Sequence, residues 1–466
     1  MSRLTEQAAR ILDEVAAFAS ARGQTVYLVG GFIRDRLLRR ACADIDITME
    51  ADALEFARSF ASAKGYGPAV FYGRFGTAML NIGGVKVEFA TCRAESYPEE
   101  SRKPEVRPST IHEDLARRDF TINAIAENLL TGETLDPFSG RADIKARIIR
   151  TPLDPDTTFR DDPLRILRGI RFAGKFRFTV SAETLAGMAR QAERLRIVSG
   201  ERIAEEVLRM LEASQPSRCF LLLDAVGALE LVLPEVSALK ERGTEHPCKE
   251  LFDHTLKTLD NACRKTRSVP VRLAALLHDI GKPKTLRVEQ GKVSFHRHEF
   301  VGERMASRVC QRLYLGAEDT RLVTRLIRLH LRPHLLAKEN PTDRGLRRFI
   351  REVGRDMKPL LTLARADITS ANPGRIRRAQ ERIDHLETRI TEINRRDRLS
   401  TFKLAVDGHA VMEILGIPPS RAVGWTLSHL EQRVLDGKLP NRKRDLKRYL
   451  AHNRSRIVRM SRSMVG

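Results

Sequence analysis

Apolar positions divide the chain into a short N-terminal part, where helices alternate with strands, and a long remainder with helical periodicity. The spacing over residues 5–22 predicts an amphipathic helix, and a second helix is predicted over about 32–40. Four strands are predicted in the same part, over 25–29, 44–49, 77–82 and 85–90. The first of these strands ends at a Gly-Gly pair, and the last two are divided by another.

From about residue 112 onward the apolar spacing is mostly helical. The segment 95–110 is rich in proline, serine and charge, and we expect it to be a mobile loop. Prolines near 152–163, the stretch 243–247 and the Asn-Pro-Gly at 372–374 mark seams between helical blocks. The pattern predicts an α+β protein with a small mixed α/β head and a long all-α remainder. The predicted head, helical neck, third helical domain and basic helical tail span 1–150, 151–240, 241–372 and 373–466.

The composition is that of a large globular protein. The chain has 466 residues, 42% of them apolar, so we expect about two to four domains. Its six cysteines are widely spaced and form no CxxC pair, which favours reduced thiols over a zinc ribbon or a redox site. The first residues lack the apolar stretch of a signal peptide, and no window approaches a membrane span. We therefore expect a cytoplasmic protein without membrane contact.

The charge balance predicts a polyanionic partner. The chain has 82 Lys and Arg against 60 Asp and Glu, a formal charge of +22, and such a field attracts nucleic acid. Aromatic residues make up 6% and are not interleaved with basic ones, which favours a phosphate-binding surface over a groove of stacked bases. Residues 438–462 contain ten basic residues and one acidic residue, Asp445. This stretch fits a solvated helix face and an RNA-backbone contact equally well.

The sharpest local feature is a Gly-Gly turn followed closely by two aspartates. Gly30 and Gly31 lead from a predicted strand into a helix, where backbone amides could hold a triphosphate. Asp44 and Asp46 are two apart on a strand and share a face, and such a carboxylate pair favours Mg²⁺ or Mn²⁺. Glu88 on a nearby strand is a candidate third ligand. Each piece alone is often a turn or a solvated strand end, but the ordered set indicates metal-assisted phosphoryl transfer.

Five ordered segments resemble the motifs of class II tRNA nucleotidyltransferases and bacterial poly(A) polymerases, members of the polymerase-β-like superfamily. They are GGFIRD at 30–35 with DID at 44–46, RRDFTINA at 117–124, DPFSG at 136–140 with Asp143, DDPLR at 161–165, and SGERI at 199–203 with Glu206. The resemblance implies a polymerase-β-like head in which Asp44 and Asp46 are catalytic and hold Mg²⁺. The nucleotide-binding residues that it implies are Gly30, Gly31, Arg34, Arg117, Arg118, Asp119, Asn123, Asp162, Arg165 and Arg168.

The DDPLR segment predicts how a base would be selected without a template. Asp162 and Arg165 are three apart, so we expect both to project from one helix face. A carboxylate accepts from an exocyclic amine and Arg donates to ring acceptors, so the pair can admit C and A and reject U and G. In the family a Glu precedes this Asp and steadies the Arg, whereas this chain has the shorter Asp161. Taken alone, Arg165, Arg168 and Arg171 would indicate an ordinary amphipathic helix.

A second candidate site surrounds a His-Asp pair at the end of an apolar predicted helix, followed by Gly281-Lys282. Imidazole and carboxylate ligands from several helices suit Mn²⁺, Ni²⁺, Fe or Mg²⁺. The set resembles the HD phosphohydrolase superfamily, which implies a divalent transition metal, although the domain could instead serve as an RNA-binding scaffold. The candidate ligands are His254, His278, Asp279 and Asp367, then His298 and His330, with His296 and His334 as alternates.

The leading hypothesis is addition of CMP and AMP, from CTP and ATP, to the 3′ end of a tRNA. Within that class the alternatives are addition of CC only, of A only, or of poly(A). The segment 96–109 lies where the family carries a loop needed for the final A, and Phe75-Gly76-Thr77-Ala78 looks more like the tRNA enzymes. Alternatives of other classes are an HD-type phosphohydrolase acting on RNA ends or nucleotides, and a catalytically silent RNA-binding protein.

Overall fold

The computed structural model forms two compact units, Met1–Thr320 and Arg321–Gly466. It describes residues 3–40, 42, 44–73, 76–96, 105–240, 250–290, 292–339, 341–397 and 403–463. Within this part of the chain, no helix combines the length and apolar character that crossing a bilayer requires. The five cysteines in the described ranges are free thiols, and Cys248 lies outside these ranges.

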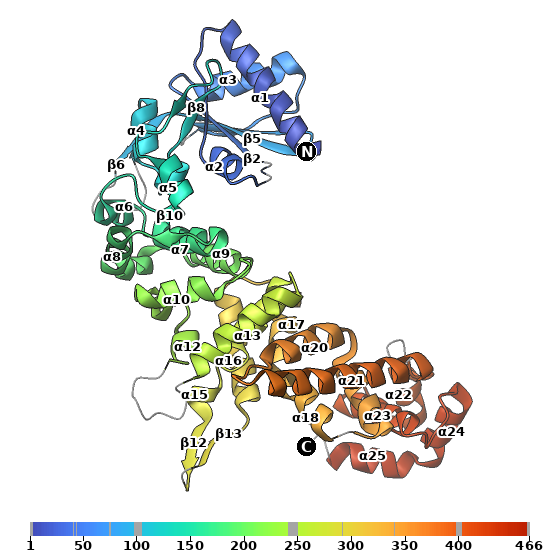
Figure 1. The fold of residues 1–466 in the computed structure, drawn as a ribbon. Helices are drawn as coiled ribbons and strands as arrows, with labels where there is room; N and C mark the ends of the chain where they lie inside the picture. The colour runs from blue at the N-terminus through green and yellow to red at the C-terminus, as the bar shows by residue number, and fades with distance from the viewer. Residues whose placement is uncertain are drawn as a thin grey trace. The chain divides into compact units, whose positions relative to one another are not determined.

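The head is built on a seven-stranded sheet with the order β3-β4-β5-β2-β1-β8-β9 (Figure 1). Its strands are β1 (Tyr27–Val29), β2 (Asp44–Met49), β3 (Val70–Tyr72), β4 (Thr77–Ile82), β5 (Val85–Thr91), β8 (Ala126–Asn128) and β9 (Thr134–Leu135). The strands predicted at 44–49, 77–82 and 85–90 are confirmed, and the first predicted strand is shorter than expected. β2 runs parallel to β5, and the other neighbouring strands in the sheet are antiparallel. This arrangement places the two aspartates of β2 in the middle of the sheet.

Three helices accompany this sheet: α1 (Arg3–Ala21), α2 (Gly31–Leu37) and α3 (Ala53–Lys64). The first two confirm the predicted helices. Asp52 caps the start of α3, and its carboxylate accepts hydrogen bonds from two backbone amides of the first turn. α1 and α3 pack against β5 through aromatic side chains, with the Phe18 and Phe56 rings 5.3 Å apart and the Phe56 and Phe89 rings 5.5 Å apart. This aromatic layer covers one face of the sheet and shields it from solvent.

The segment expected to be a loop at 95–110 is partly a hairpin. β6 (Arg93–Ser96) pairs antiparallel with β7 (Glu105–Pro108), and the register places Arg93 opposite Pro108. The loop prediction is therefore wrong for the described ends of this segment, and residues 97–104 lie outside the described ranges. Pro108 is tolerated because it occupies the last position of a two-stranded edge, where a missing amide donor costs little.

The rest of the first unit is mainly helical, as predicted. Its helices are α4 (Ile111–Ala116), α5 (Gly140–Ala146), α6 (Pro155–Asp161), α7 (Leu164–Phe176), α8 (Ala182–Gln191), α9 (Gly200–Leu211), α10 (Ser217–Ala225), α11 (Ala228–Val232), α12 (Pro234–Ser237), α13 (Leu251–Lys265), α14 (Val269–Leu277), α15 (Lys282–Thr285) and α16 (His298–Arg312). It also contains the short parallel pair β10 (Ile148–Ile149) and β11 (Thr179–Val180), and the hairpin β12 (Leu286–Glu289) with β13 (Lys292–Phe295). Two 3-10 turns, η2 (Thr121–Asn123) and η3 (Ala192–Ile197), complete the described elements, and α17 (Ala317–Leu329) begins in this unit.

The second unit is all-helical. Its helices after α17 are α18 (Leu331–Glu339), α19 (Asp343–Val353), α20 (Met357–Asp367), α21 (Pro373–Asp397), α22 (Gly408–Leu415), α23 (Arg421–Leu435), α24 (Lys443–His452) and α25 (Arg454–Ser463), with the turn η4 (Gly354–Asp356). The seam predicted at 372–374 coincides with the start of the long charged helix α21. In the tail, Leu430, Leu446 and Leu450 are buried in one apolar cluster. The Trp425 ring stacks on His429, with centroids 5.1 Å apart and planes at 11°.

Candidate active site

The Gly-Gly turn brings the start of α2 close to the middle of the sheet. Gly30 has a φ of 69°, a left-handed backbone conformation that favours glycine. A Cβ atom at this position would lie 3.0 Å from Arg118 Nη1 and 3.4 Å from Asp46 Oδ2. The turn therefore needs glycine for two reasons, its backbone angle and the close approach of charged side chains.

Three carboxylates gather on adjacent parallel strands. Asp44 and Asp46 lie on β2 with Ile45 fully buried between them, and Asp46 is in register with Glu88 on β5. Burial raises the pKa of Asp46; the charge of Arg118 lowers it, and that of Asp44 raises it again. Burial likewise raises the pKa of Glu88, and the charge of Asp46 adds to the rise. The result is a set of hard oxygen donors whose negative charges are not fully compensated.

Two arginines beside this carboxylate set are held by one buried acid. Asp114 on α4 is 1% exposed and accepts hydrogen bonds from Arg117 Nε at 3.1 Å and from Arg118 Nη2 at 3.0 Å. Burial by itself would raise the pKa of Asp114, but the charges of Arg118 and Arg117 outweigh it and lower the pKa. Asp114 thus stays ionised and fixes both guanidinium groups in place.

A buried polar network joins the head to α7. The Asp119 carboxylate accepts hydrogen bonds from Asn123 Nδ2 at 2.8 Å and from Arg168 Nε at 2.8 Å. Asn123 Oδ1 in turn accepts a 2.6 Å hydrogen bond from Arg34 Nη1, whose guanidinium also lies over the Phe176 ring. Burial would raise the pKa of Asp119, yet the charge of Arg168 and the hydrogen bonds from Asn123 and Arg168 lower it to about 2. These residues position one another as a unit.

The DDPLR segment departs from the expected geometry. Asp162 is not on a helix face: it has extended backbone angles and caps the end of α6, because Pro163 disfavours helical angles at the residue before it. Its carboxylate accepts a hydrogen bond from the Leu164 amide at 3.2 Å and one from Arg202 Nη2 at 3.1 Å. Arg165 donates to the backbone carbonyls of Arg117 and Thr158, at 2.9 and 3.4 Å. These two backbone carbonyls hold the Arg165 guanidinium.

One cavity of about 520 Å³ collects most of these groups, and neither Glu88 nor Asp114 is among its lining residues. It includes both aspartates of β2 and every predicted nucleotide-binding residue: Gly30, Gly31, Arg34, Asp44, Asp46, Arg117, Arg118, Asp119, Asn123, Asp162, Arg165 and Arg168. The sequence prediction missed five further lining residues: Arg171, Phe172, Lys175, Arg202 and Arg209. Nine basic side chains therefore face four carboxylates, an excess that suits a polyanionic ligand such as a nucleoside triphosphate.

The arginine stripe of α7 is not a solvated helix face. Arg171 is buried and donates from Nε to Glu206 Oε2 on α9 at 2.6 Å, which ties α7 to the SGERI helix. Lys175 also lines the cavity, and burial lowers its pKa. The helical spacing of Arg165, Arg168 and Arg171 could have identified the third member, but it does not separate a cavity lining from a surface.

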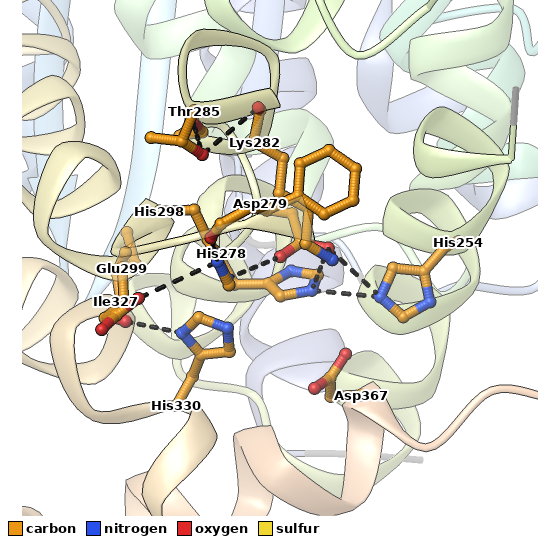
Figure 2. Close-up of polar contacts among 12 residues, drawn as sticks. His254, His278, Asp279, Lys282, Thr285, His298, Glu299, Ile327, His330 and Asp367 are labelled. Carbon is orange, nitrogen blue, oxygen red and sulfur yellow. Dashed lines mark hydrogen bonds and ion pairs between the residues drawn. The ribbon is translucent and has the colours of Figure 1, made fainter. Parts of the chain in front are cut away.

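The second predicted site has a compact core in the first unit. Figure 2 shows that His254 from α13, the His278-Asp279 pair after α14 and His298 from α16 point toward one another. His254 Nε2 and His278 Nε2 are 3.2 Å apart, and Asp279 oxygens lie 3.2 Å from His278 Nε2 and 3.5 Å from His298 Nε2. Lys282 Nζ donates to Asp279 Oδ2 at 2.6 Å, a contact that the sequence prediction missed.

The ring orientations in this cluster leave the Nε2 atoms as ligands. His278 Nδ1 lies 2.9 Å from the Ala275 carbonyl, and His298 Nδ1 lies 2.9 Å from the Phe295 carbonyl. A carbonyl only accepts, so each Nδ1 carries a proton, and Nε2 is the ring nitrogen that faces the Asp279 carboxylate. Together with a nearly fully buried carboxylate, this donor set fits a divalent transition metal.

Of the remaining candidate ligands, His330, Asp367 and His334 belong to the second unit and His296 belongs to the first. His330 is buried, and its Nδ1 lies 2.6 Å from the Ile327 carbonyl. Asp367 ends α20, and its Oδ2 lies 3.2 Å from Nε2 of His334, one of the two alternates. His296, the other alternate, is an exposed residue of the first unit.

Comparison with known protein families assigns successive parts of the chain. Residues 26–150 match the poly A polymerase head domain, 177–240 match the probable RNA and SrmB-binding site of polymerase A, and 251–372 match the HD domain. A multifunctional CCA protein of Laribacter hongkongensis is 34% identical over 359 residues, which cover 73% of this chain and 84% of the relative. The chain belongs to the multifunctional CCA protein family.

Other members of the multifunctional CCA protein family match a shorter stretch. The protein of Chromobacterium violaceum is 38% identical over 272 residues, 56% of this chain, and the match spans 63% of that relative's length. Among solved structures, a Bacillus stearothermophilus CCA-adding enzyme in complex with CTP has a TM-score of 0.69 at 23% identity, covering 98% of this chain and 100% of that one. A Thermotoga maritima CCA-adding enzyme complexed with tRNA has a TM-score of 0.60 at 22% identity, over 96% and 95% of the two chains. These structures show the shared fold.

Proposed function

We propose that this protein adds CMP and AMP to the 3′ end of tRNA, using CTP and ATP and building or repairing the CCA end. One observation carries the proposal: a single cavity collects the β2 aspartates, the Gly-Gly turn, the RRDFTINA residues and the DDPLR residues. The curated relatives are named for CCA activity, and the solved relatives are described with CTP or with tRNA. Both facts support the proposal.

The carboxylates of the head fit a divalent cation, which we propose to be Mg²⁺. Asp44 and Asp46 supply hard oxygen donors on the cavity wall, and Glu88 lies in register beside Asp46 on the neighbouring strand. Burial of two of these carboxylates raises their pKa values, so a cation between them would offset the cost of keeping both charged. When bound, the cation would lower the charge on the attacking and leaving oxygens of phosphoryl transfer.

The protein's own residues would hold the triphosphate and the ribose. The amides at Gly30 and Gly31 begin α2, and Arg117 and Arg118 are fixed beside them by Asp114. The terminal ribose hydroxyl of the RNA would attack the α-phosphate, forming a new phosphodiester bond while pyrophosphate leaves. The excess of basic side chains in the cavity stabilises the negative charge of the triphosphate and of the departing pyrophosphate.

Base choice would rest on Asp162 and Arg165. The Arg202 guanidinium orients the Asp162 carboxylate, which would accept a hydrogen bond from the exocyclic amine that C and A share. Arg165 is held by two backbone carbonyls and would donate to a ring acceptor of the same base. We therefore propose that Asp161, although shorter than the Glu usual in the family, does not abolish selection of C and A.

The decisive experiment is incorporation of single nucleotides into defined tRNAs. Purified protein with Mg²⁺ would receive transcripts that lack CCA, end in the first C, or end in CC, each with one labelled NTP. Full CCA addition predicts C, C and A in that order. Asp44→Asn with Asp46→Asn should reduce incorporation at least about a hundredfold, whereas Asp13→Asn on the exposed side of α1 should not. Absence of incorporation with every NTP would rule the proposal out.

A second activity is proposed for the His-Asp core in the first unit. The observation that favours it is the convergence of His254, His278, Asp279 and His298, whose imidazole and carboxylate groups form a donor set that suits a metal. We infer that this core hydrolyses phosphate esters at RNA ends. His278→Ala should abolish release of phosphate from a 3′-phosphorylated RNA while CMP incorporation persists. Loss of both activities together would contradict separate sites.

A further inference from the structure

A second cavity of about 730 Å³ lies in the first unit, and it shares no lining residue with the active-site cavity. Four arginines line it: Arg177 follows α7, Arg264 lies near the end of α13, Arg267 lies in the connection to α14, and Arg272 lies on α14. They come from segments far apart in the sequence, so the fold rather than a local charge run brings them together. A volume of this size admits a nucleotide unit with its phosphates.

The outer three arginines have no carboxylate partner among the residues that the structure describes. Arg177 Nη2 is 3.4 Å from Ser214 Oγ, and Arg264 Nη1 is 3.0 Å from Asn261 Oδ1, so both contacts are to neutral groups. Within the described ranges, Arg267 has neither a hydrogen bond nor an ion pair from its side chain. All three residues are exposed. Exposed arginines elsewhere in this unit do pair with acids, as Arg190 does with Asp156.

The two acids of this cavity, Glu212 and Asp260, form no ion pair with these arginines among the residues that the structure describes. Asp260 accepts hydrogen bonds from the Ser217 amide at 3.1 Å and from the Ser217 hydroxyl at 2.7 Å, so its oxygens are used at the start of α10. Arg272 is different from the other arginines, because it is 5% exposed and donates to four backbone carbonyls, including Leu211 O at 2.6 Å and Thr266 O at 2.9 Å. It builds the floor of the cavity, and the exposed guanidinium groups remain available to a ligand.

We propose that this cavity binds the phosphate backbone of the RNA substrate, with Arg177, Arg264 and Arg267 as the phosphate ligands. A planar guanidinium presents paired donors that match phosphate oxygens. Because these arginines have no acidic partner, no existing ion pair has to be broken when they bind a phosphate. The residues from 177 to 215 that line the cavity fall within the match to an RNA-binding family model, whereas α13 and α14 lie beyond it. The proposal rests on the proposed function, because that function makes RNA the ligand.

The test is the salt dependence of RNA binding by the full chain. A double variant, Arg264→Gln with Arg267→Gln, is titrated with tRNA lacking CCA over a series of KCl concentrations, without nucleotides. Each lost phosphate contact reduces the slope of log Kd against log [KCl] by about 0.9, so the slope should fall by roughly 1.8. The matched control is Arg304→Gln with Arg308→Gln, two exposed arginines of α16 with the same charge change. Arg272 is left intact because its loss would leave buried backbone carbonyls without a hydrogen-bond donor.

In the addition assay, the double variant should show a raised KM for tRNA with kcat and the KM for CTP unchanged. A slope equal to that of the wild type, or an equal fall in the control, would overturn the assignment. A titration with AMP tests whether the cavity instead binds the phosphate of a free nucleotide. If the double variant loses AMP binding while its salt slope for tRNA equals that of the wild type, the cavity is a free-nucleotide pocket and RNA binding there is refuted. Binding needs no catalysis, so a reduced slope in a protein that adds no nucleotide would support the cavity and reject the proposed function.

Discussion

Replacing Asp119 by Asn tests whether the network between head and neck depends on a buried charge. The Asp119 carboxylate accepts hydrogen bonds from the Phe120 amide, from Asn123 Nδ2 and from Arg168 Nε, all within 2.9 Å. An Asn side chain keeps one acceptor oxygen but turns an amide group toward one of these donors. The substitution therefore leaves the Arg168 guanidinium without its counter-charge in a partly buried setting.

The size of the effect follows from the lowered pKa of Asp119. The pKa falls from 3.8 to about 2, and at about 1.36 kcal/mol per pKa unit this corresponds to about 2 kcal/mol in the free energy of unfolding. Because the folded-state pKa is depressed, this stability is fully present above the unfolded-state pKa and is lost as pH falls through the folded-state pKa. We expect Asp119→Asn to cost about 2 kcal/mol at pH 7, and the difference from wild type to shrink to roughly half near pH 3.

Urea titration followed by far-ultraviolet circular dichroism, at pH 7 and at steps down to pH 3, measures this difference. The matched control is Asp156→Asn, which breaks an Arg–Asp pair on an exposed surface and should cost well under about 1 kcal/mol. Equal effects of the two substitutions at pH 7 would show that burial does not strengthen the Asp119 contacts. A cost for Asp119→Asn that stays constant down to pH 3 would show that its charge is not responsible.

Three further substitutions have defined outcomes. Gly30→Ala places a Cβ 3.0 Å from Arg118 Nη1 at a φ of 69°, so kcat for CMP addition should fall at least about tenfold while circular dichroism stays unchanged. Glu206→Gln leaves a buried guanidinium unpaired and should lower the unfolding free energy by about 3 kcal/mol in urea titrations; a cost no larger than that of the exposed Glu205→Gln would contradict this. Arg202→Ala releases the base-selecting carboxylate, so the kcat/KM ratio of CTP over UTP should fall roughly tenfold, with Arg202→Lys partly restoring it; an unchanged ratio would remove Arg202 from base selection.

The strands and turns of the head were predictable because local chemistry determines them. The alternation of Asp44, Ile45 and Asp46 defines a face of β2 whatever its neighbours are, and the Gly-Gly turn has a backbone that glycine favours. Strands of two or three residues, such as β8 and β9, are too short to show an alternation of apolar and polar residues. They form because neighbouring strands of the sheet pair with them. The β6–β7 hairpin was missed because its polar composition is typical of loops.

The site was predictable where a motif is contiguous, and less so where the fold joins distant residues. Asp162 was placed on a helix face from its spacing to Arg165, but Pro163 forces extended angles on it. Arg202 reaches it from 40 residues away, a pairing that no periodicity contains. In the second site the same limit applies to Lys282, whose ion pair with Asp279 depends on the turn after α14.

Trp425 gives the tail an optical signal of its own. It is the single tryptophan of the chain and belongs to the second unit, so emission excited through indole reports on that unit alone. His429 stacks against it, and burial, followed by the charges of Arg433 and Arg456, lowers the pKa of this imidazole. A protonated imidazole quenches indole more strongly than a neutral one, so the emission should dim only below the ordinary pKa of histidine. Spectroscopy can thus follow the tail in the intact chain while chemistry proceeds in the other unit.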